Sequence, residues 1–165
     1  VGNIGIGYQV LDALTGGVTA YKGDYNVGIG YASLSDLTEG DNNVAIGGSA
    51  GADITTGRLN IAIGASALRE NSTGSDNVAI GNSSNYTGTG GRNTSVGTSS
   101  LNSLTTGTNN VAMGYGSQQY SQDGDYNISV GIEAMQGDYG TGDRSDGTLD
   151  DNYNTAVGYR ACYFR

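Results

Sequence analysis

The sequence contains no proline, no histidine and no tryptophan, and it has a single cysteine. Without histidine there is no imidazole base and no Cys/His metal site, and one cysteine permits no internal disulfide. Leucine, isoleucine, valine and phenylalanine together make up under a fifth of the 165 residues, which is too little for an ordinary globular core. A stable fold therefore requires a regular pattern that orders the thirty glycines and the many short polar residues.

Positive charge is also scarce, with 7 Lys and Arg against 16 Asp and Glu and a net charge of −9. A chain of this kind lacks the basic surface that binds phosphate backbones or anionic lipid, so we expect no nucleic-acid partner. No apolar run approaches the roughly 20 residues that span a bilayer, and we expect no membrane insertion by this segment. The chain starts at Val1 with no signal-peptide pattern, which favours an internal piece of a longer protein.

A short unit of the form Asn-x-Ala-Ile-Gly recurs nine times along the chain. The asparagines that anchor it are Asn3, Asn26, Asn43, Asn60, Asn77, Asn93, Asn110, Asn127 and Asn154. Four residues later there is always a glycine, namely Gly7, Gly30, Gly47, Gly64, Gly81, Gly97, Gly114, Gly131 and Gly158. Most anchors are 16 or 17 residues apart, and the two longer steps place insertions near residues 14–25 and 136–153.

A period of this length suits one coil of a parallel β-solenoid, with two short strands and two turns. We therefore predict an all-β fold: a single domain over residues 1–165 with about nine coils. The recurring asparagine predicts a ladder in which each amide bonds to the neighbouring coils, and the recurring glycine predicts a corner that excludes a Cβ atom. The absence of proline agrees, because stacked coils need every backbone N–H.

Side chains alternate between the two faces of the strand that follows each anchor. We expect the β-branched residues to fill the coil interior and the Ala, Ser or Gly between them to form an outward stripe. Such a stripe would be covered by another copy of the chain. A second apolar set is expected to close the interior from the second strand: Leu11, Leu34, Leu68, Leu101 and Met135. Cys162 occupies the same repeat position and is expected to act as a small apolar residue, whereas Gly51, Asn85 and Gln118 should weaken their coils.

The units Asn43–Gly47, Asn60–Gly64 and Asn77–Gly81 resemble the head repeats of YadA-like trimeric autotransporter adhesins, and similar repeats occur in phage tail fibres. The resemblance covers essentially the whole chain. It implies a left-handed β-roll, three chains around a threefold axis and an extracellular attachment role, on a virion tail fibre or a bacterial cell surface. The coil of about 17 residues is longer than the roughly 14 of the adhesin heads.

Recognition of a host-surface glycan or protein is expected in the insertions, because functional variation on solenoids concentrates there. The candidate receptor contacts are Tyr139, Arg144 and Tyr153. A solvated acidic loop is the first interpretation of the second insertion, and a calcium site is the alternative. The carboxylates concerned are Asp138, Asp143, Asp146, Asp150 and Asp151.

Tyrosines recur beside the corner glycine and beside the anchor, which favours stacked ladders, with a sugar-binding surface as the alternative. The sequence predicts no enzyme and no cofactor, since no acidic pair recurs in a cleft-like context; a polysaccharide depolymerase is the enzymatic alternative. Ice binding is a further alternative, because hydroxyl pairs stack in four central coils. Those pairs are Thr55/Thr56, Ser72/Thr73, Thr87/Thr89 and Thr105/Thr106.

Overall fold

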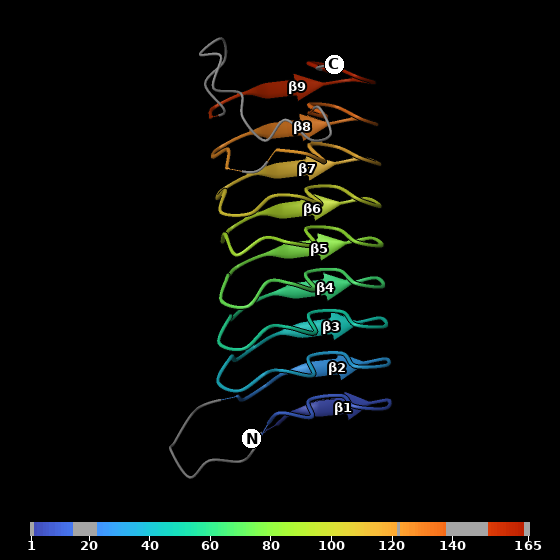
Figure 1. Ribbon diagram of the computed structural model, residues 1–165, viewed down its shortest axis with the longest axis vertical. Coiled ribbons are helices and arrows are strands. Elements are labelled where there is room, and N and C mark those ends of the chain that lie inside the picture. The colour runs from blue at the N-terminus through green and yellow to red at the C-terminus, as the bar shows by residue number, and fades with distance from the viewer. Residues whose placement is uncertain (1, 15–22, 122, 138–151, 164–165) are drawn as a thin grey trace.

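The computed structural model describes residues 2–14, 23–121, 123–137 and 152–163. These residues form a parallel β-solenoid with nine strands in one sheet, stacked in chain order (Figure 1). The predicted all-β solenoid is therefore confirmed. The strands are β1 (Ile4–Ile6), β2 (Val27–Ile29), β3 (Val44–Ile46), β4 (Ile61–Ile63), β5 (Val78–Ile80), β6 (Thr94–Val96), β7 (Val111–Met113), β8 (Ile128–Val130) and β9 (Thr155–Val157).

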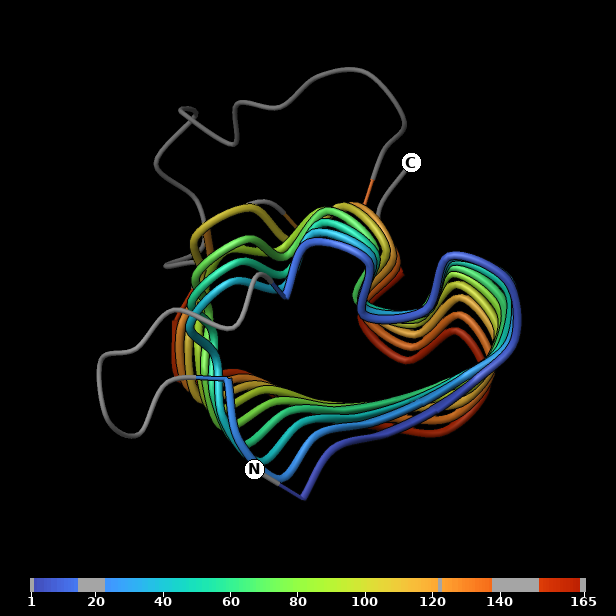
Figure 2. The same ribbon diagram turned by 90° about the horizontal axis from the view of Figure 1, so that it is seen from below.

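The register between neighbouring strands places equivalent repeat positions side by side. Ala45 of β3 lies between Gly28 of β2 and Ala62 of β4, for example. Viewed down the stack, the coils superpose, so each repeat position forms a row along the rod (Figure 2). We call the segment from one anchor asparagine to the next a coil, and we number positions within it from that anchor.

The described residues of each coil contain one strand, and the prediction of a second strand was wrong. The segment that carries the second apolar set is a series of turns in which residues alternate into the left-handed region, such as Ala32 (φ 51°) and Leu34 (φ 51°). This alternation directs the backbone N–H of Ala32 to Tyr8 O in the preceding coil and that of Leu34 to Ala50 O in the following coil. The turns are thus hydrogen-bonded from coil to coil without extended geometry.

The two faces of the strand are oriented opposite to the prediction. The central Ala or Ser of each complete coil points inward: Ala45, Ala79 and Ala112 are fully buried. The bulkier flanking residues face outward, and Ile46 and Ile80 are among the exposed apolar side chains. The physical reason is the narrow interior.

Even the smallest side chain is tightly accommodated at this inward position. A Cβ atom added to Gly28 would lie 2.6 Å from Cγ1 of Val10, which belongs to the turn segment of the preceding coil. A β-branched residue therefore does not fit beside the turn segment. The core is completed by side chains of that segment, and Leu34, Leu37, Leu68, Leu101 and Leu104 are all fully buried.

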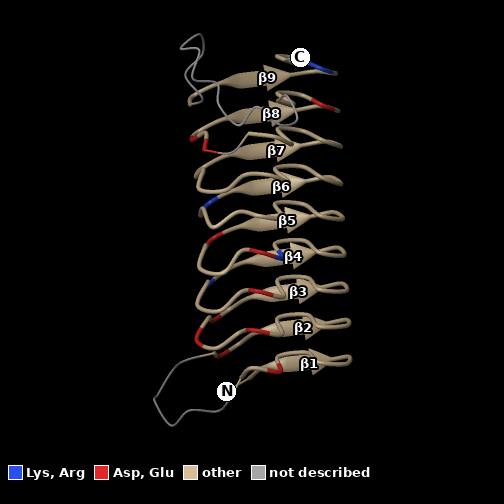
Figure 3. Ribbon diagram, viewed as in Figure 1, with Lys and Arg blue, Asp and Glu red and all other residues tan. Residues whose placement is uncertain are grey.

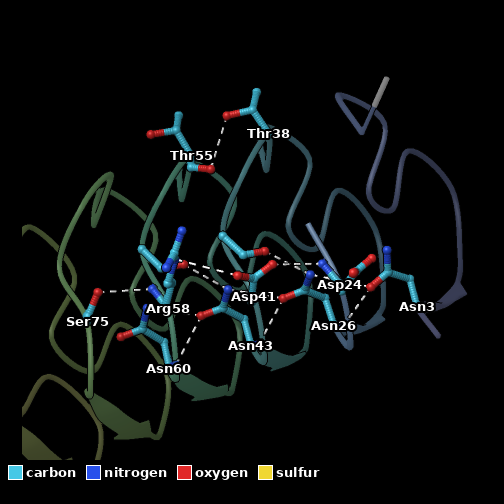
Figure 4. Close-up of polar contacts among 12 residues, drawn as sticks. Asn3, Asp24, Asn26, Thr38, Asp41, Asn43, Thr55, Arg58, Asn60 and Ser75 are labelled. Atoms are coloured by element: carbon cyan, nitrogen blue, oxygen red, sulfur yellow. Dashed lines mark hydrogen bonds and ion pairs between the residues drawn. The ribbon is translucent and has the colours of Figure 1, made fainter. Parts of the chain in front are cut away.

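The anchor asparagines form a continuous hydrogen-bonded ladder through the stack (Figure 4). Oδ1 of Asn43 accepts from the backbone N–H and from Nδ2 of Asn60, both at 3.0 Å. Nδ2 of Asn43 donates to Oδ1 of Asn26 at 3.1 Å and to Gly57 O at 2.9 Å. These side chains are buried, and each amide is matched by partners in the two neighbouring coils and by a glycine carbonyl at the end of its own coil.

The corner glycine combines an unusual backbone conformation with a close approach between coils. Gly64 has φ +130°, and a Cβ atom there would lie 2.5 Å from the carbonyl oxygen of Gly81. Any side chain would therefore both strain the backbone and push the next coil away. Gly48, only one residue beyond the corner of the preceding coil, would meet nothing within 4 Å.

We expect Gly64→Ala to lower the free energy of unfolding by about 1–3 kcal/mol, because the conformation disfavours a Cβ atom and the carbonyl of Gly81 blocks it. Gly48→Ala is the matched control and should leave the stability nearly unchanged. Urea denaturation of the two variants measures the difference. Equal unfolding midpoints would show that position 64 is not a constrained corner.

Candidate interaction surface

The outward face of the sheet is an uncharged apolar surface that runs the length of the rod. We call it the outer sheet face and define it by the first and third residues after each anchor. None of its residues is charged, and the strand arrows carry no charge colour in Figure 3. Its most exposed members are Ile4, Ile6, Ile46, Ile61, Ile80, Met113, Ile128 and Val157.

Tyrosines border this face on both sides and are exposed. One row follows the corner glycine and contains Tyr8, Tyr31, Tyr115 and Tyr159; the other precedes the anchor and contains Tyr25, Tyr126 and Tyr153. Where adjacent coils both carry the residue, the rings stack: Tyr8 and Tyr31 at 5.8 Å between centroids, and Tyr126 and Tyr153 at 5.0 Å. The aromatic rings extend the apolar surface beyond the strands near both ends of the described stack.

A second polar row, which the sequence interpretation missed, lies two residues before most of the anchors. Oδ1 of Asp41 accepts from the backbone N–H of Asp24 at 2.9 Å, and the Ser75 hydroxyl accepts from the N–H of Arg58 at 3.0 Å (Figure 4). Arg58 also lies 3.6 Å from an Asp41 oxygen. Toward the other end of the stack, Oδ1 of Asp125 likewise accepts from the backbone N–H of Thr108. The recurrence of Asp, Ser or Asn at this position was the available sequence signal.

Acidic side chains occupy one row of the turn segment in three consecutive coils: Asp36, Asp53 and Glu70. The pKa of Asp53 is raised above 3.8 by its partial burial, by the negative charge of Asp36 and also by Glu70, while Arg69 opposes the shift. The row is a mild electrostatic cost of stacking like charges one coil apart. Within the described ranges, no three acidic or cysteine side chains are grouped to hold a metal ion.

We expect Asp53→Asn to raise the melting temperature at neutral pH. The folded state binds the Asp53 proton more tightly than the unfolded chain does, so ionisation lowers stability as the pH rises through the folded-state pKa. The advantage of the amide should therefore shrink as the pH falls and disappear below 3.8, the ordinary value.

Thermal melts of both proteins over this pH range test the prediction. Asp76→Asn, which removes an exposed carboxylate outside the row, is the control. A gain for Asp53→Asn that does not depend on pH would rule out the electrostatic explanation.

The candidate calcium ligands Asp138, Asp143, Asp146, Asp150 and Asp151 lie outside the described residues, as do the candidate receptor contacts Tyr139 and Arg144. Tyr153 is described, and it is 74% exposed at the border of the outer sheet face. Of the candidate contact residues, the structure therefore places Tyr153, and most of both insertions lies outside the described ranges.

Several threonines of the hydroxyl pairs considered for ice binding donate their hydroxyl hydrogens to the neighbouring coils. Oγ1 of Thr55 donates to Ser72 O at 3.0 Å, and Oγ1 of Thr89 donates to Thr105 O at 3.0 Å. Thr106 donates to Oδ1 of Asp123 at 3.2 Å. These hydroxyls stabilise the turns, which leaves them fewer hydrogens with which to order external water.

Cys162 is exposed, contrary to the prediction of a buried apolar residue. Leu101 at the same repeat position is fully buried because coils on both sides cover it. No described coil follows Cys162 in the stack, so its side chain lacks that cover.

No protein-family model matches this chain, and no curated protein or solved structure does. Among the described residues, no helix is long and apolar enough to cross a membrane. The outer sheet face and its tyrosine borders form the most extensive exposed apolar surface of the described residues.

Proposed function

We propose that this chain is a non-enzymatic segment of an extracellular attachment fibre, in which three copies pack around a common axis as left-handed β-rolls. A phage tail fibre that binds a host-surface glycan or protein is the first assignment. The head of a bacterial trimeric autotransporter adhesin is the alternative. The resemblance of the Asn-x-Ala-Ile-Gly units to both families supports the pair of assignments.

The observation that carries the proposal is the uncovered apolar surface of the sheet. Ile46, Ile61 and Ile80 are each 37–38% exposed in three successive coils, and Met113 and Ile128, in two later successive coils, are 43–44% exposed on the same face. Soluble monomers rarely expose a contiguous apolar patch of such extent, and an uncharged flat surface suits association with its own copies. A threefold arrangement would turn this face of each chain toward the shared axis.

The shape of the molecule also agrees with a fibre segment. Each coil adds about 4.8 Å to the length of a stack, so the sheet forms a rod that separates its two ends rather than a compact body. The charged residues that the structure describes lie outside the strands, in the segments that connect them (Figure 3). The rod therefore offers one surface for self-association and other surfaces for contact with a cell.

We expect the purified chain to sediment as a trimer and Ile61→Lys to shift it toward monomers, because a lysine would be buried without a partner charge in the assembly. Thr56→Lys is the matched control, since this residue is exposed on the turn side of the preceding coil. Sedimentation equilibrium gives the masses, and circular dichroism checks that both variants fold. A monomeric wild-type chain, or an unaltered Ile61→Lys trimer, would contradict the proposed interface.

Attachment is expected to depend on the second insertion. Its sequence is unlike the repeats, and three copies displayed together would strengthen a weak contact by avidity. Deleting Asp138–Asp151, with a short glycine bridge in its place, should preserve the assembled mass and reduce binding to host cells. The binding of labelled protein to a panel of bacteria measures the effect. Undiminished attachment would move recognition to the exposed tyrosines or outside this chain.

A further inference from the structure

Two asparagine side chains interrupt the apolar core in the middle of the stack. Positions eight and eleven of the coils form two inner columns, in which leucine is the commonest residue. Asn71 stands at position eleven, between Ile54 and Gly88, and Asn85 stands at position eight, between Leu68 and Leu101. The core is accordingly divided into two clusters, one ending at Leu68 and Ala79 and the other beginning at Leu101.

Both amides are completely buried and lack hydrogen-bond partners. Asn71 and Asn85 have no exposed surface, and within the described part of the chain neither Oδ1 nor Nδ2 of either residue has a partner. Their backbone N–H groups are bonded, since that of Asn85 donates to Ser100 O at 2.8 Å and that of Asn71 to Leu68 O at 3.3 Å. A buried polar side chain costs about 1–3 kcal/mol when nothing bonds to it.

A glycine lies beside each amide, and Gly88 stands where other coils have a side chain. A Cβ atom on Gly88 would lie 2.5 Å from Oδ1 of Asn85, so this amide reaches into the column of position eleven. A Cβ atom on Gly74 would lie 2.6 Å from Oδ1 of Asn71, although Gly74 belongs to the glycine row that recurs three residues before the anchors. The coil that contains Asn85 is also the shortest, because its anchor is followed by the next after 16 residues. The polar residues, the glycines and the shortened coil coincide in one place.

We infer that Asn71 and Asn85 form an internal hydration site that holds at least one ordered water molecule between them. Gly88 and Asn71 are neighbours in the column of position eleven, and the Asn85 amide reaches that column at Gly88. The two amides are thus about one coil spacing, roughly 4.8 Å, apart, which exceeds a direct hydrogen bond and matches the span of a single bridging water. A carboxamide both donates and accepts, and so does water, whereas an ion would satisfy only half of each group. Buried waters of this kind bond to otherwise unmatched polar groups and become part of the fold.

The hydration site lies between the coil of β4 and the coil of β5. The inference does not depend on the proposed attachment function. The test uses water itself as the probe on the uniformly ¹⁵N-labelled full chain. Cross-relaxation from water to the Nδ2 protons of Asn71 and Asn85 should be strong and should report a long-lived contact. Asn60 is an equally buried control whose Nδ2 donates to Asn43 Oδ1 and Gly74 O, and it should show no such signal.

A second measurement separates hydration from direct pairing of the two amides. Asn71→Leu together with Asn85→Leu restores the residue that prevails in these columns and should raise the melting temperature by a few degrees, whereas Asn60→Leu should lower it. Absence of the water signal, or contacts only between the two amides, overturns the inference. A loss of stability in the double variant as large as in Asn60→Leu also overturns it, since it would mean that both amides have protein partners.

Discussion

The fold depends on one interaction: the hydrogen bonds that join each coil to the coils above and below it. The anchor asparagine shows it most clearly, because Oδ1 and Nδ2 of Asn43 bond to Asn60 and Asn26 in the two neighbouring coils, and Nδ2 also donates to Gly57 O within its own coil. Such bonds exist only when coils stack at a fixed spacing and in one register. The same spacing brings the carbonyl of Gly81 against Gly64 and so requires glycine at the corner. Repetition is therefore what compensates for a small apolar content.

Much of this could be predicted from the sequence because it repeats. The period, the parallel stack and the places of the anchor and corner residues follow from spacing alone. The conformation of the turn segment does not, since Leu34, Ser66 and Gln118 in the left-handed region have side chains that normally avoid it. Local preference is overridden there by coil-to-coil hydrogen bonds and by burial of the leucines. That is why a second strand was wrongly predicted.

The inverted faces of the strand have a different cause. Alternation in sequence predicts that two faces differ but not which one is enclosed, and the larger side chains are ordinarily placed inside. Here the width of the coil decides, because the turn segment lies so close that Gly28 has no space for a larger side chain beside Val10. A solenoid with a narrow interior thus places its β-branched residues outward. In the proposed trimer this apolar surface is buried between the chains rather than inside each one.

The separation of apolar and charged surfaces is compatible with the proposed self-association of an acidic chain. The net charge of −9 resides on turns and insertions, whereas the outer sheet face carries none of it. Copies that approach face to face keep their carboxylates apart and in water, so the repulsion between them is screened over about 10 Å at ordinary ionic strength. Approach through the turn side would instead bring Asp36, Asp53 and Glu70 of two chains together. The charge pattern therefore disfavours the wrong contacts while leaving the apolar one open.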